Sequence, residues 1–241
     1  MVATVEWWLV RHGVTAWNHE RRYQGHSDIP LLAGAEAGLE GLKQELGGVD
    51  FAAVYASDLR RCRETLATSR PDLIDIMQPD VRLRELNFGQ WEGCTYEQLK
   101  DNDNYRSWID HPQTVTPPGG ESWQAFESRV MDLYAELLTI SQTLVWAATG
   151  REAAKPDLMP ASPLHLPPDS RRLHESNPGP WALPAIKEDK SKEPLMNPSV
   201  RLLIVTHGGV IAKLSSLVHP ELDFWDTRVA PGGIQRLSLT L

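Results

Sequence analysis

Apolar positions along the chain are grouped into short runs that predict buried strands. Residues 5–10 and 201–205 are almost continuously apolar, which is typical of strands covered on both faces. Residues 51–55 form a shorter run of the same kind, and the alternation of apolar and polar residues over 232–241 predicts a last strand at a sheet edge. These runs together predict a mostly parallel β-sheet.

Segments with helical spacing of apolar residues lie between these runs. One predicted helix face consists of Ala35, Leu39, Leu42 and Leu46, and a longer one consists of Trp123, Phe126, Val130, Leu133 and Leu137. Ser57 and Asp58 follow the third run and are residue types typical of a helix N-cap, so we expect a helix to begin there. Strands that alternate with helices predict an α/β, doubly wound fold with helices flanking the sheet.

One stretch lacks this periodicity. Residues 147–199 contain ten of the eighteen prolines together with many charged residues. We interpret them as a proline-rich insertion, mobile or disordered, within a single domain that spans residues 1–241. Two hypotheses remain for the insertion: a lid that alters substrate choice, and a surface segment without a role.

Composition narrows the classes of partner and compartment. The 241 residues carry a formal charge of −8, which disfavours nucleic acid and anionic membranes because binding to either depends on a basic surface. An anionic substrate therefore needs a local cluster of arginines. The chain has two cysteines, and no apolar stretch reaches the roughly 18 residues of a membrane span, so we expect a soluble, cytoplasmic protein.

Two histidines follow the two longest predicted strands. His12 lies between Arg11 and Gly13 at the end of the first run, and His207 follows the run at 201–205. Ligands of open α/β sheets bind at the carboxyl ends of the strands, where the two halves of the sheet diverge. We therefore expect both histidines to face one site.

Five motifs occur in the order of a known family. They are Arg11-His12-Gly13 with Thr15, Asn18, Gln24 and Gly25 downstream, the run from Ser57 to Thr65, the run from Glu85 to Gly93, the run from Pro118 to Ser122, and the run from Thr206 to Gly209. In this order they resemble the histidine phosphatase, or phosphoglycerate mutase-like, superfamily. The resemblance covers residues 6 to about 218 apart from the insertion.

The resemblance implies a role for each candidate residue. His12 matches the phosphoryl acceptor, Glu85 the proton donor and His207 the second histidine of the pocket. Arg61 matches the phosphate-binding position, although composition alone does not separate it from the arginines beside it. For His12 to attack, one ring nitrogen must be unprotonated, so we expect an acceptor such as a backbone carbonyl to hold the proton on the other.

The remaining candidates surround the expected phosphate. We expect the phosphate to be bound by Arg11, Arg61, Asn18 and His207, and the rest of the substrate by Gln24 and Gly25. Guanidinium groups match phosphate oxygens in pairs. A turn-stabilising role is the alternative for Asn18 and Gln24. A metal cluster of His12, Asp28, Glu85 and His207 is disfavoured because two arginines repel a cation, so we expect no metal and no cofactor.

The choice among activities depends on the segment after Glu85. The short stretch from Trp91 to Ser122 resembles the phosphatase branch, including the α-ribazole phosphatases of cobalamin synthesis and broad-specificity phosphatases. We therefore expect a phosphoric monoester hydrolase for a small-molecule ester, with a phosphohistidine intermediate. Phosphoglycerate mutase-type transfer and non-catalytic binding of a phospho-ligand are the alternatives. A second copy of the chain, in a homodimer, is a candidate partner.

Overall fold

The core of the molecule is a five-stranded sheet, seen in a computed structural model that describes residues 4–149 and 199–241. The strands are β1 (Thr4–Arg11), β2 (Ala53–Ala56), β3 (Met77–Pro79), β4 (Ser199–Thr206) and β5 (Ile234–Thr240). Their spatial order is β3-β2-β4-β1-β5, and only β5 runs antiparallel to its neighbour. The mostly parallel sheet and the strand at its edge are confirmed.

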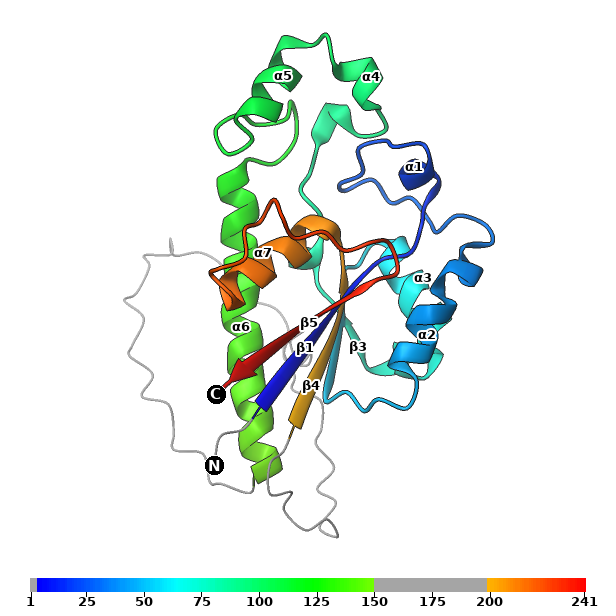
Figure 1. The fold of residues 1–241 in the computed structure, drawn as a ribbon, viewed down its shortest axis with the longest axis vertical. Coiled ribbons are helices and arrows are strands. Elements are labelled where there is room, and N and C mark those ends of the chain that lie inside the picture. The colour runs from blue at the N-terminus through cyan, green and yellow to red at the C-terminus, as the bar shows by residue number, and fades with distance from the viewer. Residues whose placement is uncertain (1–3, 150–198) are drawn as a thin grey trace, which may run out of the picture.

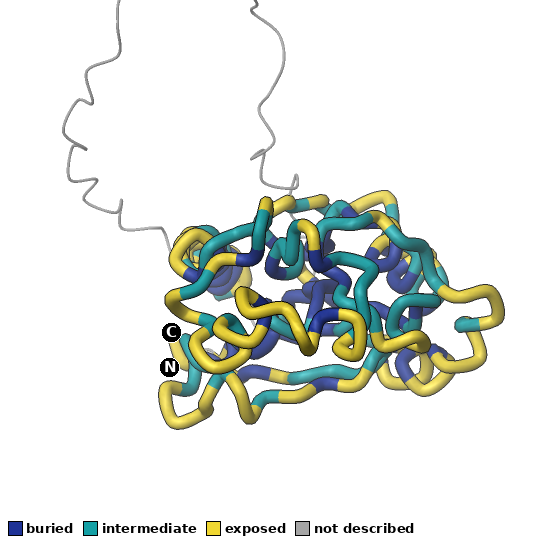
Figure 2. Tube along the Cα trace, turned by 90° about the horizontal axis from the view of Figure 1, so that it is seen from above, coloured by how far each residue is buried: buried dark blue, intermediate teal, exposed yellow. Residues whose placement is uncertain are grey.

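Helices cover both faces of this sheet, as the doubly wound fold requires (Figure 1). Successive side chains of a strand point to opposite faces, so the residues of β1 divide between two cores. Trp7 and Leu9 pack in the core that includes residues of α6 (Trp123–Thr149) and α7 (Gly208–Val218). Trp8 and Val10 pack on the other face, against α2 (Glu40–Leu46) and α3 (Arg60–Ser69). Figure 2 shows the buried residues gathered between the exposed outer loops.

Shorter elements connect these layers. They are α1 (Ala16–His19), α4 (Tyr96–Leu99) and α5 (Asp103–Asp110), with the 3-10 helices η1 (Ala35–Leu39), η2 (Pro71–Ile76), η3 (Val81–Leu83) and η4 (Gly89–Trp91). The helix predicted over residues 35–46 is thus divided into η1 and α2. Gly38 and Gly41 lie near the division, and glycine disfavours a continuous helix by about 1 kcal/mol relative to alanine.

A small aromatic core holds η4, α4 and α5 together. Trp91, Leu99 and Tyr105 are buried in it, and Tyr23 and Trp108 pack against them. This core fixes α4 and α5 above the sheet, at the end opposite the chain termini.

Two boundaries differ from the prediction. Ser57 and Asp58 do not cap α3, which begins at Arg60 with Leu59 as its N-cap residue. The Asp28 carboxylate, from a distant loop, accepts from the Arg60 backbone N–H at 2.7 Å instead. Residues 147–149 belong to α6 and residue 199 to β4, while the rest of the predicted insertion lies outside the described residues.

Two features of the described chain bear on the compartment in which the protein works. None of its helices is both long and apolar enough to cross a membrane. Cys62 and Cys94 are both free thiols, the first of them buried.

Strand β3 was not among the predicted strands, because its three residues are too few to show a period.

Candidate active site

The register of the central strands brings the two histidines together. Arg11 of β1 pairs with Thr206 of β4, so the next residues along each strand, His12 and His207, lie side by side. Their ring centroids are 5.1 Å apart. The chain leaves β1 toward the β2 side of the sheet and leaves β4 toward β5, so the pair lies at the switch point where ligands of such sheets bind.

His12 is held as a neutral ring with one free nitrogen. It is buried, and its Nδ1 lies 2.8 Å from the carbonyl oxygen of Gly13. Because a carbonyl only accepts, Nδ1 carries the proton and Nε2 keeps its lone pair. Burial lowers the pKa of His12 to about 3, and the positive charges of Arg61 and Arg11 act in the same direction. The His12 ring is therefore neutral at neutral pH, and its role as the phosphoryl acceptor stays a prediction.

His207 is also neutral, but both of its ring nitrogens have protein partners. Arg61 Nε donates to His207 Nδ1 at 3.3 Å, so the proton of His207 is on Nε2, which lies 3.0 Å from Ser57 Oγ. Burial, followed by the charge of Arg61, holds the pKa of His207 well below its usual value. The hydrogen bond expected from His207 to phosphate stays a prediction.

Arg61 is the arginine of α3 that faces the site. It is completely buried, whereas Arg60 and Arg63 are exposed. Its Nη1 donates to the carbonyl of Ser27 at 2.8 Å and its Nη2 to that of Gly25 at 2.6 Å. Together with Nε these bonds use three of the five guanidinium N–H groups, which leaves two for a phosphate.

Gly25 acts through its backbone in this structure. A Cβ atom there would lie 2.3 Å from the carbonyl oxygen of Leu86, so no larger residue fits. Its carbonyl holds Arg61, and a direct contact of Gly25 with substrate stays a prediction.

Arg11 and Gln24 offer buried donors without acceptors. Arg11 Nη1 donates to the carbonyl of Val229 at 2.7 Å, but its Nε meets no acceptor among the described residues. Gln24 Oε1 accepts from Thr15 Oγ1 at 2.8 Å, while its Nε2 is likewise buried and unpaired. An unpaired buried donor costs about 1–3 kcal/mol. The oxygens of a bound phosphate would satisfy such donors.

Glu85 reaches the site from the loop after η3. Its carboxylate oxygens accept from the backbone N–H groups of Leu86 and of Gly209, both at 2.9 Å, and Gly209 lies in the first turn of α7. A Cβ atom on Gly209 would lie 2.3 Å from this carboxylate. Burial lowers the pKa values of Arg11 and Arg61, and the charge of Glu85 opposes that shift in both. The Glu85 carboxylate thus lies near both arginines, and its role as proton donor stays a prediction.

Asn18 has a structural role in the described conformation. Its Oδ1 accepts from the backbone N–H and from the hydroxyl of Thr15, both at 3.0 Å, and its own N–H donates to that hydroxyl. These bonds form the capping box of α1. The turn-stabilising alternative is therefore realised, and contact of Asn18 with phosphate stays a prediction.

Four residues that support the site were not predicted. Thr65 Oγ1 accepts from the Gly13 N–H at 2.8 Å, and the Glu92 carboxylate accepts from the backbone of residues 26 and 27. Ser57 holds His207, and Arg129 on α6 donates to the carbonyl of Glu85 at 2.9 Å. Ser57, Thr65 and Glu92 lie inside the sequence motifs, which is a signal that could have found them. Arg129 is far from Glu85 in the sequence, so no local pattern indicated their contact.

The alternative metal cluster does not assemble. Asp28, one of its four candidate ligands, caps α3 instead. Across residues 4–149 and 199–241, no group of three or more His, Cys, Asp or Glu side chains is placed to hold a metal ion.

Comparison with known proteins shows the family to which the chain belongs. The family model of the histidine phosphatase superfamily (branch 1) matches residues 7–149, which are more than half of the chain. The chain belongs to this superfamily. An adenosylcobalamin/alpha-ribazole phosphatase of Escherichia coli (strain K12) is 36% identical over 132 residues, which are 54% of this chain and 65% of that protein.

Two further similarities concern a second activity and the fold. A "Probable phosphoglycerate mutase GpmB" of Salmonella typhi is 34% identical over 137 residues, 56% of this chain and 64% of that protein. The matched part thus spans a little under two thirds of both relatives. An alpha-ribazole phosphatase from Shigella flexneri has a similar structure, with a TM-score of 0.67, 23% identity and coverage of 98% of this chain and 94% of that one. At this identity the similarity concerns the fold.

Proposed function

We propose that this chain is a metal-independent phosphomonoesterase that hydrolyses a small-molecule ester through a phosphohistidine at His12. The observation that carries the proposal is the neutral, buried His12 ring, whose Nδ1 proton is bound to Gly13 and whose Nε2 is free. A neutral imidazole nitrogen beside two guanidinium groups is the arrangement that an attack on a phosphate dianion requires.

In the first step Nε2 of His12 attacks phosphorus while the ester oxygen leaves. The bond from phosphorus to the ester oxygen breaks as the bond to nitrogen forms, and Glu85 in its protonated form gives the leaving oxygen its proton. Arg11 and Arg61 stabilise the charge on the phosphoryl oxygens: Arg11 Nε has no acceptor among the described residues, and the hydrogen bonds of Arg61 use three of its five N–H groups.

In the second step water removes the phosphoryl group. Glu85, now a carboxylate, takes a proton from the attacking water, and the bond between nitrogen and phosphorus breaks. Inorganic phosphate leaves and His12 returns to its neutral state. The backbone N–H groups of Leu86 and Gly209 keep the carboxylate in place through both steps.

The names of the relatives suggest one class of ester as the substrate and a second activity as the alternative. A relative named as an adenosylcobalamin/alpha-ribazole phosphatase makes α-ribazole phosphate the first substrate to test. A mutase, suggested by the relative named for phosphoglycerate, would return the phosphoryl group to a sugar acid and release little of it to water. A silent binding module is disfavoured because every residue of the proposed chemistry is present.

The test is phosphate release from p-nitrophenyl phosphate, 3-phosphoglycerate and α-ribazole phosphate, with a chelator present. We expect release by the wild-type chain and none by His12→Ala. Isomerised phosphoglycerate without free phosphate would establish the mutase instead. Failure to act on any ester, together with tight binding of one, would establish the binding module.

We also propose a reducing, cytoplasmic location, supported by the two free thiols. The partner of the chain is then a small phosphate ester, with neither nucleic acid nor membrane involved, as the charge of −8 supports. Homodimer formation stays a prediction that sedimentation would test.

A further inference from the structure

A groove lies between α5 and the loop that follows α7. Residues 109–114 and Trp225 line it, and its volume of about 420 Å³ falls in the range of small-molecule sites. Ile109 and Trp225 both remain largely exposed, at 45% and 48%. The other residues that line the groove are Asp110, His111, Pro112, Gln113 and Thr114. Apolar surface together with a few polar groups is typical of sites that bind and orient an organic ligand.

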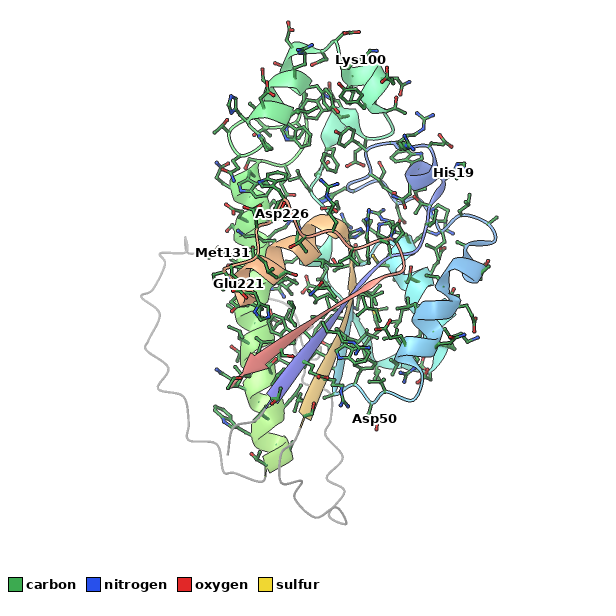
Figure 3. The ribbon with its side chains drawn as sticks, viewed as in Figure 1. His19, Asp50, Lys100, Met131, Glu221 and Asp226 are labelled. Carbon is green, nitrogen blue, oxygen red and sulfur yellow. The ribbon has the colours of Figure 1, made fainter. Side chains whose placement is uncertain are left out.

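The Trp225 ring is fixed with one face available. It stacks on Trp123 with ring centroids 5.6 Å apart and an angle of 21°, and Phe224 packs edge-on against both rings. The backbone N–H of Trp225 donates to Asp223 at 2.7 Å, which holds the loop. In Figure 3, Asp226 marks this loop beside α6. Since Trp123 covers one face, the exposed area belongs to the face and edge that line the groove.

Contacts within the protein link residues beside the groove to residues of the proposed site, on two sides. Four residues after Trp225, the carbonyl of Val229 accepts from Arg11 at 2.7 Å, so the Cα atoms of Trp225 and Val229 are at most about 14 Å apart. On the other side, Arg129 lies 4.9 Å above the Phe126 ring, which packs on Trp123, and Arg129 also holds the backbone of Glu85.

We propose that this groove binds the organic part of the phosphate ester, and that this part carries a flat aromatic ring that stacks on the open face of Trp225. The inference rests on the proposed phosphatase function. With the phosphate at His12, a spacer of about the size of a sugar would have to join it to the ring at Trp225. Aromatic rings favour such offset stacks, and the binding energy gained there supports the reaction at phosphorus.

Two esters that differ only by the ring test this proposal. Adenosine 5′-monophosphate and ribose 5-phosphate share the same phosphate and sugar, so their kcat/KM ratio isolates the aromatic ring. We expect the wild-type chain to prefer the nucleotide, and Trp225→Ala to lower kcat/KM for the nucleotide about tenfold while leaving ribose 5-phosphate unchanged. Ile109→Ser, at an exposed position, should lower the same ratio without risk to folding.

Met131→Ser is the matched control, because Met131 is an exposed apolar residue of α6 outside the groove. It should leave both esters unaffected. A ratio that is unaltered by Trp225→Ala and Ile109→Ser, or equal losses on both esters, overturns the groove proposal and leaves the phosphatase function standing. No phosphate release from any ester overturns both.

Discussion

His12 is a buried histidine that the fold keeps neutral, and this has a consequence for stability. Its pKa is about 3 in the folded chain and near 6.5 when the chain unfolds. Between these values the unfolded state binds the extra proton, so the contribution of His12 to the free energy of unfolding is complete above pH 6.5 and is lost as the pH falls toward 3.

The variant His12→Asn removes this titration. We expect the free energy of unfolding of the wild-type chain to decline more steeply below pH 6.5 than that of the variant, by up to about 1.4 kcal/mol per pH unit. Urea denaturation at a series of pH values measures the difference. Parallel curves would mean that His12 is not kept neutral by folding.

Ser57 is predicted to position His207. Its hydroxyl is the acceptor for the Nε2 proton of His207, and without it the other close group is the weakly accepting thiol of Cys62 at 3.5 Å. We expect Ser57→Ala to lower kcat by about tenfold, equivalent to about 1.4 kcal/mol, and Ser57→Thr to restore part of it. Nitrogen NMR shifts of His207 should report a changed tautomer balance in the alanine variant. Lower stability with unchanged kcat and shifts would contradict this role.

Gly209 is predicted to be indispensable because of its contact with Glu85. A methyl group there would lie 2.3 Å from the carboxylate, so Gly209→Ala should displace Glu85 and lower kcat by about 10²-fold or more. Gly208→Ala is the control in the same turn, since its Cβ would meet Arg11 at an ordinary 3.5 Å. Equal activities of the two variants would show that Glu85 does not act from this position.

At the scale of elements, Arg129 ties α6 to the loop that carries Glu85. Its guanidinium donates to the carbonyls of Arg82, Arg84 and Glu85 and forms a largely buried ion pair with Glu121. Arg129→Met leaves these acceptors unpaired, so we expect the free energy of unfolding to fall by about 3 kcal/mol.

The Arg129 prediction has a surface control. Lys100→Met removes an exposed ion pair with Glu97. The free energy of unfolding of this variant, measured in urea, should stay near that of the wild-type chain. A similar loss in both variants, or none in Arg129→Met, would contradict the tie between α6 and the loop.

The elements show what local sequence patterns can predict. The runs of β1 and β4 are long enough to reveal buried strands, and the pattern of α6 continues past residue 137 to Thr149. The prediction that Ser57 caps a helix is wrong, because the residue type alone does not show which group its hydroxyl contacts. In the structure that group is the His207 ring. Strand β3 is defined by its pairing with β2, a contact that its own sequence does not encode.

At the scale of the whole molecule, the site depends on strands far apart in the sequence. The motifs predicted which residues meet, and the parallel register of β1 and β4 supplies the reason that His12 and His207 are neighbours. The choice of Arg61 among three arginines came from the motif, and its complete burial follows from the orientation of α3 on the sheet. Supporting contacts such as those of Arg129 could be recognised only in the folded structure.

A quenched reaction would show whether a covalent intermediate forms on His12. The chain is mixed with a phosphate ester labelled on phosphorus, stopped in alkali within one turnover, and digested for peptide mapping. We expect a label that is stable to base and labile to acid, that lies on the peptide containing His12, and that is absent from His12→Ala. Phosphate release without such a label, or a label on another residue, would contradict it.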